Sequence, residues 1–206
     1  MRVTDDRYSR DRLRYDLALR LIRHEARTQT IRQWTGLTDD RIRKLYRSYV
    51  RSGGGSGACV RRHRGKSPRQ VSFFARSRLL QQDTSCLIAV FSMFGVLPAQ
   101  RLSDAARMLP NVTRGELLCD AYETYRRITH QPQISFEHAA FLAVALATGS
   151  EIRLQSCRHC KGLGFGDPLT LRAVECLSCG APLRPAPSSP PPTRRLAAHA
   201  GPGPMA

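Results

Sequence analysis

The chain contains few acidic residues for its number of basic ones. It has 33 Lys and Arg against 16 Asp and Glu, which gives a formal net charge of +17 at pH 7 over 206 residues. This charge exceeds what solubility requires, so a polyanionic partner is expected. Residues 1–80 hold 21 of the basic and 7 of the acidic side chains, a net charge of +14. The electrostatic footprint is therefore expected in the N-terminal portion.

Long apolar runs are also absent. No stretch approaches the roughly 18 continuous apolar residues of a membrane-spanning helix, and Met1–Asp6 lacks the apolar centre of a secretory signal. We therefore expect a cytoplasmic protein with no membrane partner. In that reducing compartment, Cys59, Cys86 and Cys119 are expected to be free thiols.

The residue patterns of common enzymes are missing as well. We find no paired acid and base, no phosphate-binding glycine loop with Lys and Ser or Thr, and no nucleophile with a nearby base. His130 and His138 are single histidines without ligand partners at a useful spacing, so a structural or exposed position is expected for each. Enzymatic activity is therefore not expected.

What the chain does contain is two Cys-x-x-Cys motifs. Cys157 and Cys160 are followed, after fifteen residues, by Cys176 and Cys179. Each pair presents two thiolates from one tight turn, and four thiolates complete a tetrahedron around Zn²⁺. We predict one structural zinc ion, because four sulfurs leave no position for water or substrate. Two disulfides or four unrelated thiols are the alternatives, and His159 is expected to point outward.

The residues around these motifs predict a zinc-ribbon module over residues 150–182. Ile152 and Leu154 alternate with polar residues before the first cysteine, as in a strand, and Leu169–Val174 is predicted to be the returning strand. Glycines after each motif, among them Gly162, are expected to supply positive φ angles. Residues 183–206 are proline-rich and are predicted to be disordered, because they cannot bury apolar area.

The N-terminal portion predicts a helix-turn-helix region over residues 14–51, after a polar arm of residues 1–13. Apolar residues at four-residue steps predict a first helix from Arg14 to about Arg27. Residues 28–46 then resemble a helix-turn-helix, with Gly36 at the turn and Thr38 as the N-cap of the second helix. An ordinary helical hairpin with a solvated basic face is the alternative.

Basic side chains give this region its candidate DNA contacts. Those expected on the outward face of the second helix, toward solvent or a major groove, are Arg41, Arg43, Lys44 and Arg47. Residues 52–70 are predicted to be a glycine-rich linker and a basic loop, which can follow a phosphate backbone or enter a minor groove. The candidate contacts in the loop are Arg61, Arg62, Arg64, Lys66 and Arg69. A mobile charged loop is the alternative.

Residues 71–149 are predicted to form a helical core, so that the expected fold is mainly α, a helical body with a small C-terminal zinc ribbon built on four cysteines. Helix starts are predicted from capping residues. The expected N-caps are Thr84, Ser103, Thr113 and Ser135. Pro and Gly residues are expected to end these helices. The expected stops are Pro98, Pro110, Pro132 and Gly149.

Taken together, these features resemble the FlhC family of transcriptional activators, the C subunit of the bacterial flagellar master regulator. The resemblance covers residues from about 14 to 182. The stretches that carry it are Glu25–Gln29, Leu37–Arg41, Lys44–Tyr46, Arg64–Pro68, and Ser150–Gln155 with the four cysteines that follow.

The resemblance implies a subunit that binds double-stranded promoter DNA and carries zinc on those four cysteines. It also implies assembly with a small helical partner, the FlhD-type subunit, into a hetero-oligomer that recruits RNA polymerase at bacterial promoters, flagellar ones included. The alternative is a zinc-stabilised protein-interaction subunit with no direct base readout, whose basic segment is merely solvated.

Overall fold

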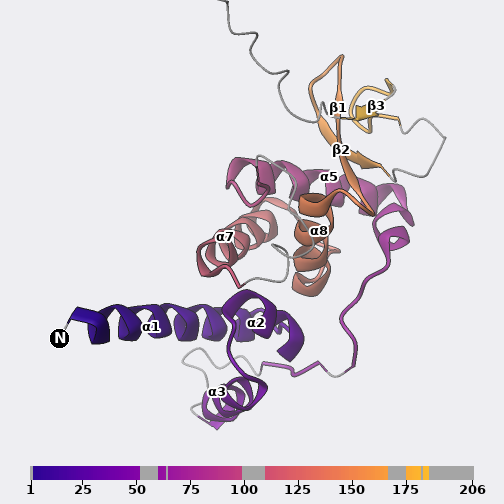
Figure 1. Ribbon diagram of the computed structural model, residues 1–206. Coiled ribbons are helices and arrows are strands. Elements are labelled where there is room, and N and C mark those ends of the chain that lie inside the picture. Colours follow the sequence, from indigo (N-terminus) through magenta and orange to yellow (C-terminus); the bar gives the residue numbers. More distant parts are fainter. Residues whose placement is uncertain are drawn as a thin grey trace, which may run out of the picture.

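Helices make up most of the described part of the chain (Figure 1). The computed structural model describes residues 2–51, 60–63, 65–98, 110–166, 175–181 and 183–185. The helices are α1 Arg2–Arg23, α2 Thr28–Thr35, α3 Asp39–Arg51, the short 3-10 helix η1 Val71–Ala75, α5 Arg78–Met93, α7 Val112–Ile128 and α8 Phe136–Thr148. The strands are β1 Arg153–Cys157, β2 Leu163–Gly166 and β3 Leu183–Pro185. None of the described helices has both the length and the apolar character needed to span a bilayer.

The helices α1, α2 and α3 lie at one end of the molecule and the strands at the other, with α5, α7 and α8 between them (Figure 1). Helix α7 packs against α1, α2, α5 and α8, while α5 and α8 contact the sheet. One cluster of buried apolar residues runs from Leu17 in α1 to Ile152 just before β1. Residues 14–51 and 71–149 therefore share a single hydrophobic core.

The first helix is longer at its start than the sequence predicted. It begins at Arg2 and ends at Arg23, so the predicted polar arm of residues 1–13 is wrong, and the boundary at Arg14 lies inside a helix. Arginine favours helix, and acidic residues one turn away form ion pairs with it. Arg14 lies 3.4 Å from Asp11, for example. Local charge pattern thus extends the helix beyond its apolar stripe.

An ionic cluster fastens α1 to α7. The Arg20 guanidinium lies 2.7 Å from Glu116, 2.5 Å from Asp120 and 2.9 Å from Glu123. Glu123 also contacts His24, at 2.9 Å. Arg20 lowers the pKa of the Glu123 carboxyl, while burial lowers the pKa of His24. The cluster therefore favours a charged Glu123 beside a neutral His24.

Of the N-caps predicted in residues 71–149, two are wrong and one is confirmed. Helix α5 begins at Arg78, six residues before the expected cap Thr84, because Ser77 is the N-cap and accepts the N–H of Leu80 at 3.2 Å. Thr84 is buried inside this helix and donates its hydroxyl to the Leu80 carbonyl. Asn111, not the predicted Thr113, caps α7. Ser135 caps α8 as predicted.

The observed helix ends also agree only in part with the predicted ones. Gly149 ends α8 in a left-handed conformation, with φ 65°, as predicted. Helix α5 ends at Met93, five residues before Pro98. The helix predicted to start at Ser103 lies outside the described residues.

The strands form a three-stranded antiparallel sheet in the order β2-β1-β3. The strand predicted before Cys157 is confirmed as β1. It pairs with β2, where Leu154 faces Phe165, and with β3, where Cys157 faces Leu183. The predicted strand at residues 169–174 lies outside the described residues. Because β3 starts at residue 183, the predicted start of the disordered tail at that residue is wrong.

Candidate metal centre and basic face

The four cysteines of the two motifs lie together beside the sheet. Their sulfur atoms are all within 4.8 Å of one another. Sγ of Cys157 is 3.4 Å from Sγ of Cys179, and Sγ of Cys160 is 3.5 Å from Sγ of Cys176. A tetrahedron of sulfurs around Zn²⁺, with bonds of about 2.3 Å, has edges of about 3.8 Å. The cluster is therefore compatible with a metal site, and these four cysteines form no disulfide with one another.

Two copies of the same turn bring the cysteines together. Cys157 donates its N–H to the carbonyl of Gly162 at 2.9 Å, and Cys176 donates its N–H to that of Ala181 at 2.7 Å. The left-handed residue in the first turn is Lys161, with φ 61°, so the sequence placed it one residue late, at Gly162. In the second turn it is Gly180, with φ 72°.

Gly162 instead leaves room beside the cysteine sulfurs. A Cβ atom at this position would lie 3.3 Å from Sγ of Cys160 and 3.9 Å from Sγ of Cys176. A larger residue here would therefore intrude on the space between the sulfurs. His159 is exposed, as predicted, and is not part of the cluster.

Backbone N–H groups point at all four sulfurs, and at two of them they lower the pKa and favour the thiolate. The N–H of Cys160 lowers the pKa of Cys157, and the N–H groups of Ser178 and Cys179 lower the pKa of Cys176 to about 6. The N–H of Ala181 acts in the same direction on Cys179, but contacts with the other three sulfurs and desolvation together outweigh it and raise the pKa of Cys179 to about 12. The four sulfurs cannot all ionise without a cation between them, and soft thiolates suit Zn²⁺.

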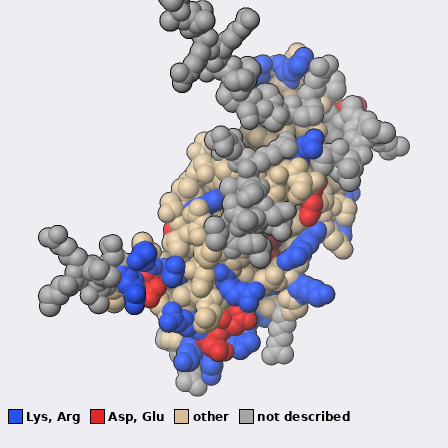
Figure 2. Space-filling model, in the orientation of Figure 1, with Lys and Arg blue, Asp and Glu red and all other residues tan. Residues whose placement is uncertain are grey.

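The second candidate site is the outward side of α3 at the other end of the molecule. Helices α2 and α3 are joined by a short turn in which Gly36 has φ 71° and donates its N–H to the Arg32 carbonyl. Ile42 and Tyr46 of α3 are buried. The four predicted contact residues of this helix are all exposed: Arg41, Arg43, Lys44 and Arg47. Lys and Arg side chains gather around this end of the molecule, with a smaller acidic group among them (Figure 2).

The basic loop, residues 60–70, is anchored beside α3. Arg61, Lys66 and Arg69 are exposed, and Arg64 lies outside the described residues. Arg62 is exposed too, and its guanidinium lies over the Tyr46 ring at 5.4 Å from the centroid. This contact joins the loop to α3. We call the exposed cations of α3 and of this loop the basic face.

Acidic residues that the sequence did not single out hold this region in place. Glu25 binds the loop: one oxygen accepts the Arg61 N–H at 3.2 Å, and the other lies 2.8 Å from Nε2 of His63. A local sequence signal was not available, because the partners lie 36 and 38 residues away.

Glu137 of α8 plays a similar part for α2. It accepts the Arg27 N–H at 2.6 Å and the Thr30 hydroxyl at 3.0 Å. Helix α2 has no side-chain cap from its own N-cap residue, so Glu137 caps it from a helix about 110 residues away. At 8% exposure this carboxylate is buried in the seam between the two parts of the chain.

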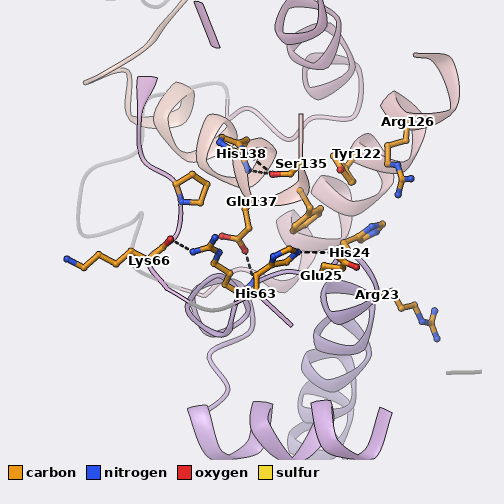
Figure 3. A pocket seen from close by; sticks show the side chains of 13 residues that line it. Arg23, His24, Glu25, His63, Lys66, Tyr122, Arg126, Ser135, Glu137 and His138 are labelled. Carbon is orange, nitrogen blue, oxygen red and sulfur yellow. Dashed lines mark hydrogen bonds and ion pairs between the residues drawn. The ribbon is translucent and has the colours of Figure 1, made fainter. Parts of the chain in front are cut away.

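The seam contains a cavity of about 500 Å³ (Figure 3). It lies between the α1–α2 connection, the basic loop and the start of α8, and its lining includes Glu25, His63 and Glu137. A dashed line in Figure 3 joins Glu25 to His63. The Arg27 guanidinium donates a hydrogen bond to the Lys66 carbonyl. These polar groups tie the loop to the body of the molecule.

No family model matches the chain, and a search of curated proteins finds no match. Function is therefore inferred from the chemistry of the two candidate sites.

Proposed function

We propose that the protein is a zinc-containing, DNA-binding transcriptional activator similar to the FlhC family. In this proposal α2 and α3 are a helix-turn-helix, α3 is its recognition helix, and the four cysteines hold one structural zinc ion. The partners are promoter DNA, a small helical FlhD-type subunit in a hetero-oligomer, and RNA polymerase. The observation that carries the proposal is the basic face, in which a helix and an anchored loop present exposed cations side by side.

The basic face has the size and charge that duplex DNA requires. A major groove about 12 Å wide admits one α-helix, and the 13 residues of α3 give it a length of about 20 Å. The helix is basic outside and apolar inside, so it can lie in a groove without exposing its core contacts. Cations of the loop would then neutralise phosphates beside the groove, which releases counterions and supplies much of the affinity.

The acidic residues of α3 offset only part of this charge. Asp40 lies 2.9 Å from Arg43, and Asp39 lies 3.8 Å from Arg32 of α2. Both acids are in the first turn of α3, where they complement the positive end of the helix dipole. Within the described part of the chain, Arg41 and Lys44 form no ion pair, so both are available to a ligand.

Zinc has a structural role in the proposal. The donor set is four sulfurs, which leaves no open position for chemistry, and the site lies at the opposite end of the molecule from α3 (Figure 1). The metal would therefore fix the ribbon and not contact DNA. The FlhD-type subunit and RNA polymerase rest on the resemblance. In the fold, two stretches that carry it, Glu25–Gln29 and Arg64–Pro68, contact each other through Arg27 and Lys66.

A binding selection from random duplexes tests the proposal. We expect the full chain with its partner subunit to enrich a defined sequence. Arg43→Ala should relax the preference at one base pair and cost about 1–3 kcal/mol of binding free energy, if Arg43 reads a guanine. Arg127→Ala, which removes an exposed arginine of α7 outside the basic face, is the matched control. Selection of no sequence by the wild type would contradict the proposal.

A second candidate is a zinc-stabilised protein-interaction subunit with no direct base readout. It is favoured by a largely apolar groove of about 350 Å³ between η1, the start of α5 and the ribbon, lined in part by Val71, Phe165 and Leu183. On α5 itself, Leu79 and Met93 are 72% and 81% exposed. Salt separates the two candidates, because DNA binding weakens steeply as salt rises while an apolar interface barely responds.

A further inference from the structure

Glu25 is an acidic residue within the most basic part of the chain. It lies two residues after the end of α1 and has φ 58°, a left-handed conformation that residues other than glycine adopt at a cost. Its carboxylate holds two loop residues at once, through the Arg61 N–H and the His63 ring. Burial tends to raise the pKa of Glu25, but these two bonds outweigh it and lower the pKa. The residue is thus a charged clip on the basic loop.

The clip fixes the cation that lies between its two contacts. Arg62 is held over the ring of Tyr46, which belongs to α3. Tyr46 in turn donates its hydroxyl to the carbonyl of Ala26, the residue after Glu25. The end of α1, the middle of α3 and the start of the loop are therefore joined at one point. Because of this, the spacing between the cations of the loop and those of α3 is set by residues 25 and 26.

We propose that Glu25 is a positioning residue for DNA binding, which holds the basic loop beside α3 so that both contact the same duplex. The inference rests on the proposed function. It predicts an effect opposite to that of simple charge. Removing an acid from a DNA-binding region normally reduces repulsion and strengthens binding, whereas removing Glu25 should weaken binding because the loop cations lose their place.

Glu25→Gly is the main test variant. Glycine accepts the positive φ without strain, so the backbone of the α1–α2 connection is retained while the clip is lost. The probe is a mixed-sequence duplex of about 30 base pairs, titrated with the full chain by fluorescence anisotropy at several salt concentrations. We expect affinity about tenfold weaker at low salt. The slope of log K against log salt should fall in magnitude by about 2, because each lost phosphate contact removes about 0.9.

Two further variants separate positioning from charge and from folding. Asp16→Asn removes an exposed acid of α1 that pairs only weakly, at 3.8 Å, with Arg12, and it should leave the affinity unchanged or raise it. His63→Ala breaks the clip from the loop side and should lower affinity and slope in the same direction as Glu25→Gly. Both variants, like Glu25→Gly, should retain the thermal midpoint of the wild type within a few degrees.

A double-mutant cycle distinguishes positioning of the loop cations from a purely structural role of Glu25, because only the first depends on the charge of the loop. In a background where Arg61, Arg62, Arg64, Lys66 and Arg69 are all glutamine, the loop has no Lys or Arg left to position. There Glu25→Gly should have no further effect on affinity. An equal effect in both backgrounds would overturn the inference.

The binding experiment distinguishes failure of this inference from failure of the proposed function. If the wild type does not bind duplex DNA even at low salt, the proposed function fails and the inference with it. If the wild type binds but Glu25→Gly binds as tightly, with the same salt slope, only the role of Glu25 is wrong.

Discussion

The buried carboxylate of Glu137 joins the two parts of the chain through one residue. Glu137→Ala would leave the Arg27 N–H and the Thr30 hydroxyl without their acceptor. Because buried hydrogen bonds to a charged group are costly to lose, we expect the free energy of unfolding to fall by about 3 kcal/mol, and by about 1 kcal/mol for Glu137→Gln. Urea-induced unfolding measures both.

Glu151→Ala is the control for this change, since Glu151 is exposed near the end of α8. It should alter stability by less than about 0.5 kcal/mol. If Glu137→Ala were as mild as the control, Glu137 would not be the cap of α2.

Acid should weaken the contact between α1 and α7. Burial lowers the pKa of His24 from 6.5, so below that pH the unfolded chain binds a proton more readily than the folded one. The pKa of Glu123 is lowered from 4.5, chiefly by Arg20, so its contribution is lost as the pH falls below that value. Stability should therefore decline from pH 7 to pH 6, and further below pH 4.5.

Unfolding free energies at pH 7.5, 6.0 and 4.0 measure this decline. His24→Gln should flatten the upper step, although His138, whose pKa burial also lowers, retains part of it. Stability that stays constant or rises on acidification would show that neither group is perturbed as described.

At single residues, the sequence predicted what depends on near neighbours. Ser135 and Gly149 bound α8 as predicted, because a cap interacts within one turn of its own helix. The four cysteines were found for the same reason, since each motif is one tight turn. The contacts of Glu25 and Glu137 were not predicted, because their partners are distant in the chain and nothing local distinguishes these residues from solvent-exposed acids.

At the level of elements, the ribbon depends on its metal in our proposal. Its strands are short, with five, four and three residues, so little besides the cysteine cluster holds β3 against β1. Binding of Zn²⁺ to such a site contributes about 10 kcal/mol or more to local folding. Cys176→Ser should therefore abolish stoichiometric zinc and open the ribbon to proteolysis.

Metal content by atomic absorption and the rate of limited proteolysis check this prediction. Cys86→Ser is the control, because Cys86 belongs to α5 and lies outside the cluster. A Cys176→Ser protein that keeps its metal and its resistance to protease would remove the structural role of the site.

Helix boundaries were harder to predict than helix existence. Thr84 has the chemistry of an N-cap, but it satisfies its hydroxyl on a carbonyl inside α5, where Ser77 is the true cap. At α1, the buried apolar stripe begins at Leu17 and Leu13 is exposed, whereas the helix begins at Arg2. Periodicity reports which residues face the core, and a helix extends beyond that stripe wherever local propensity and ion pairs support it.

On the scale of the whole molecule, the proposal assigns a structural metal site to one end and DNA binding to the other. The sheet that holds Cys157 lies at one end and α3, which carries part of the basic face, lies at the other (Figure 1). The charge asymmetry of the sequence located the basic end, because charge is a property of composition. It did not reveal that the basic loop lies against α3. That position depends on the left-handed backbone of Glu25 after α1 and on the contact between Arg62 and Tyr46.

The most direct test of duplex binding by the basic face is a salt titration of the full chain, purified without chelator and with its partner subunit, on double-stranded DNA. We predict tight binding at low ionic strength, with log K falling linearly with log salt and a slope of about −4 or steeper, since each phosphate contact contributes about −0.9. The absence of binding at low salt, or an affinity that does not change with salt, would contradict it.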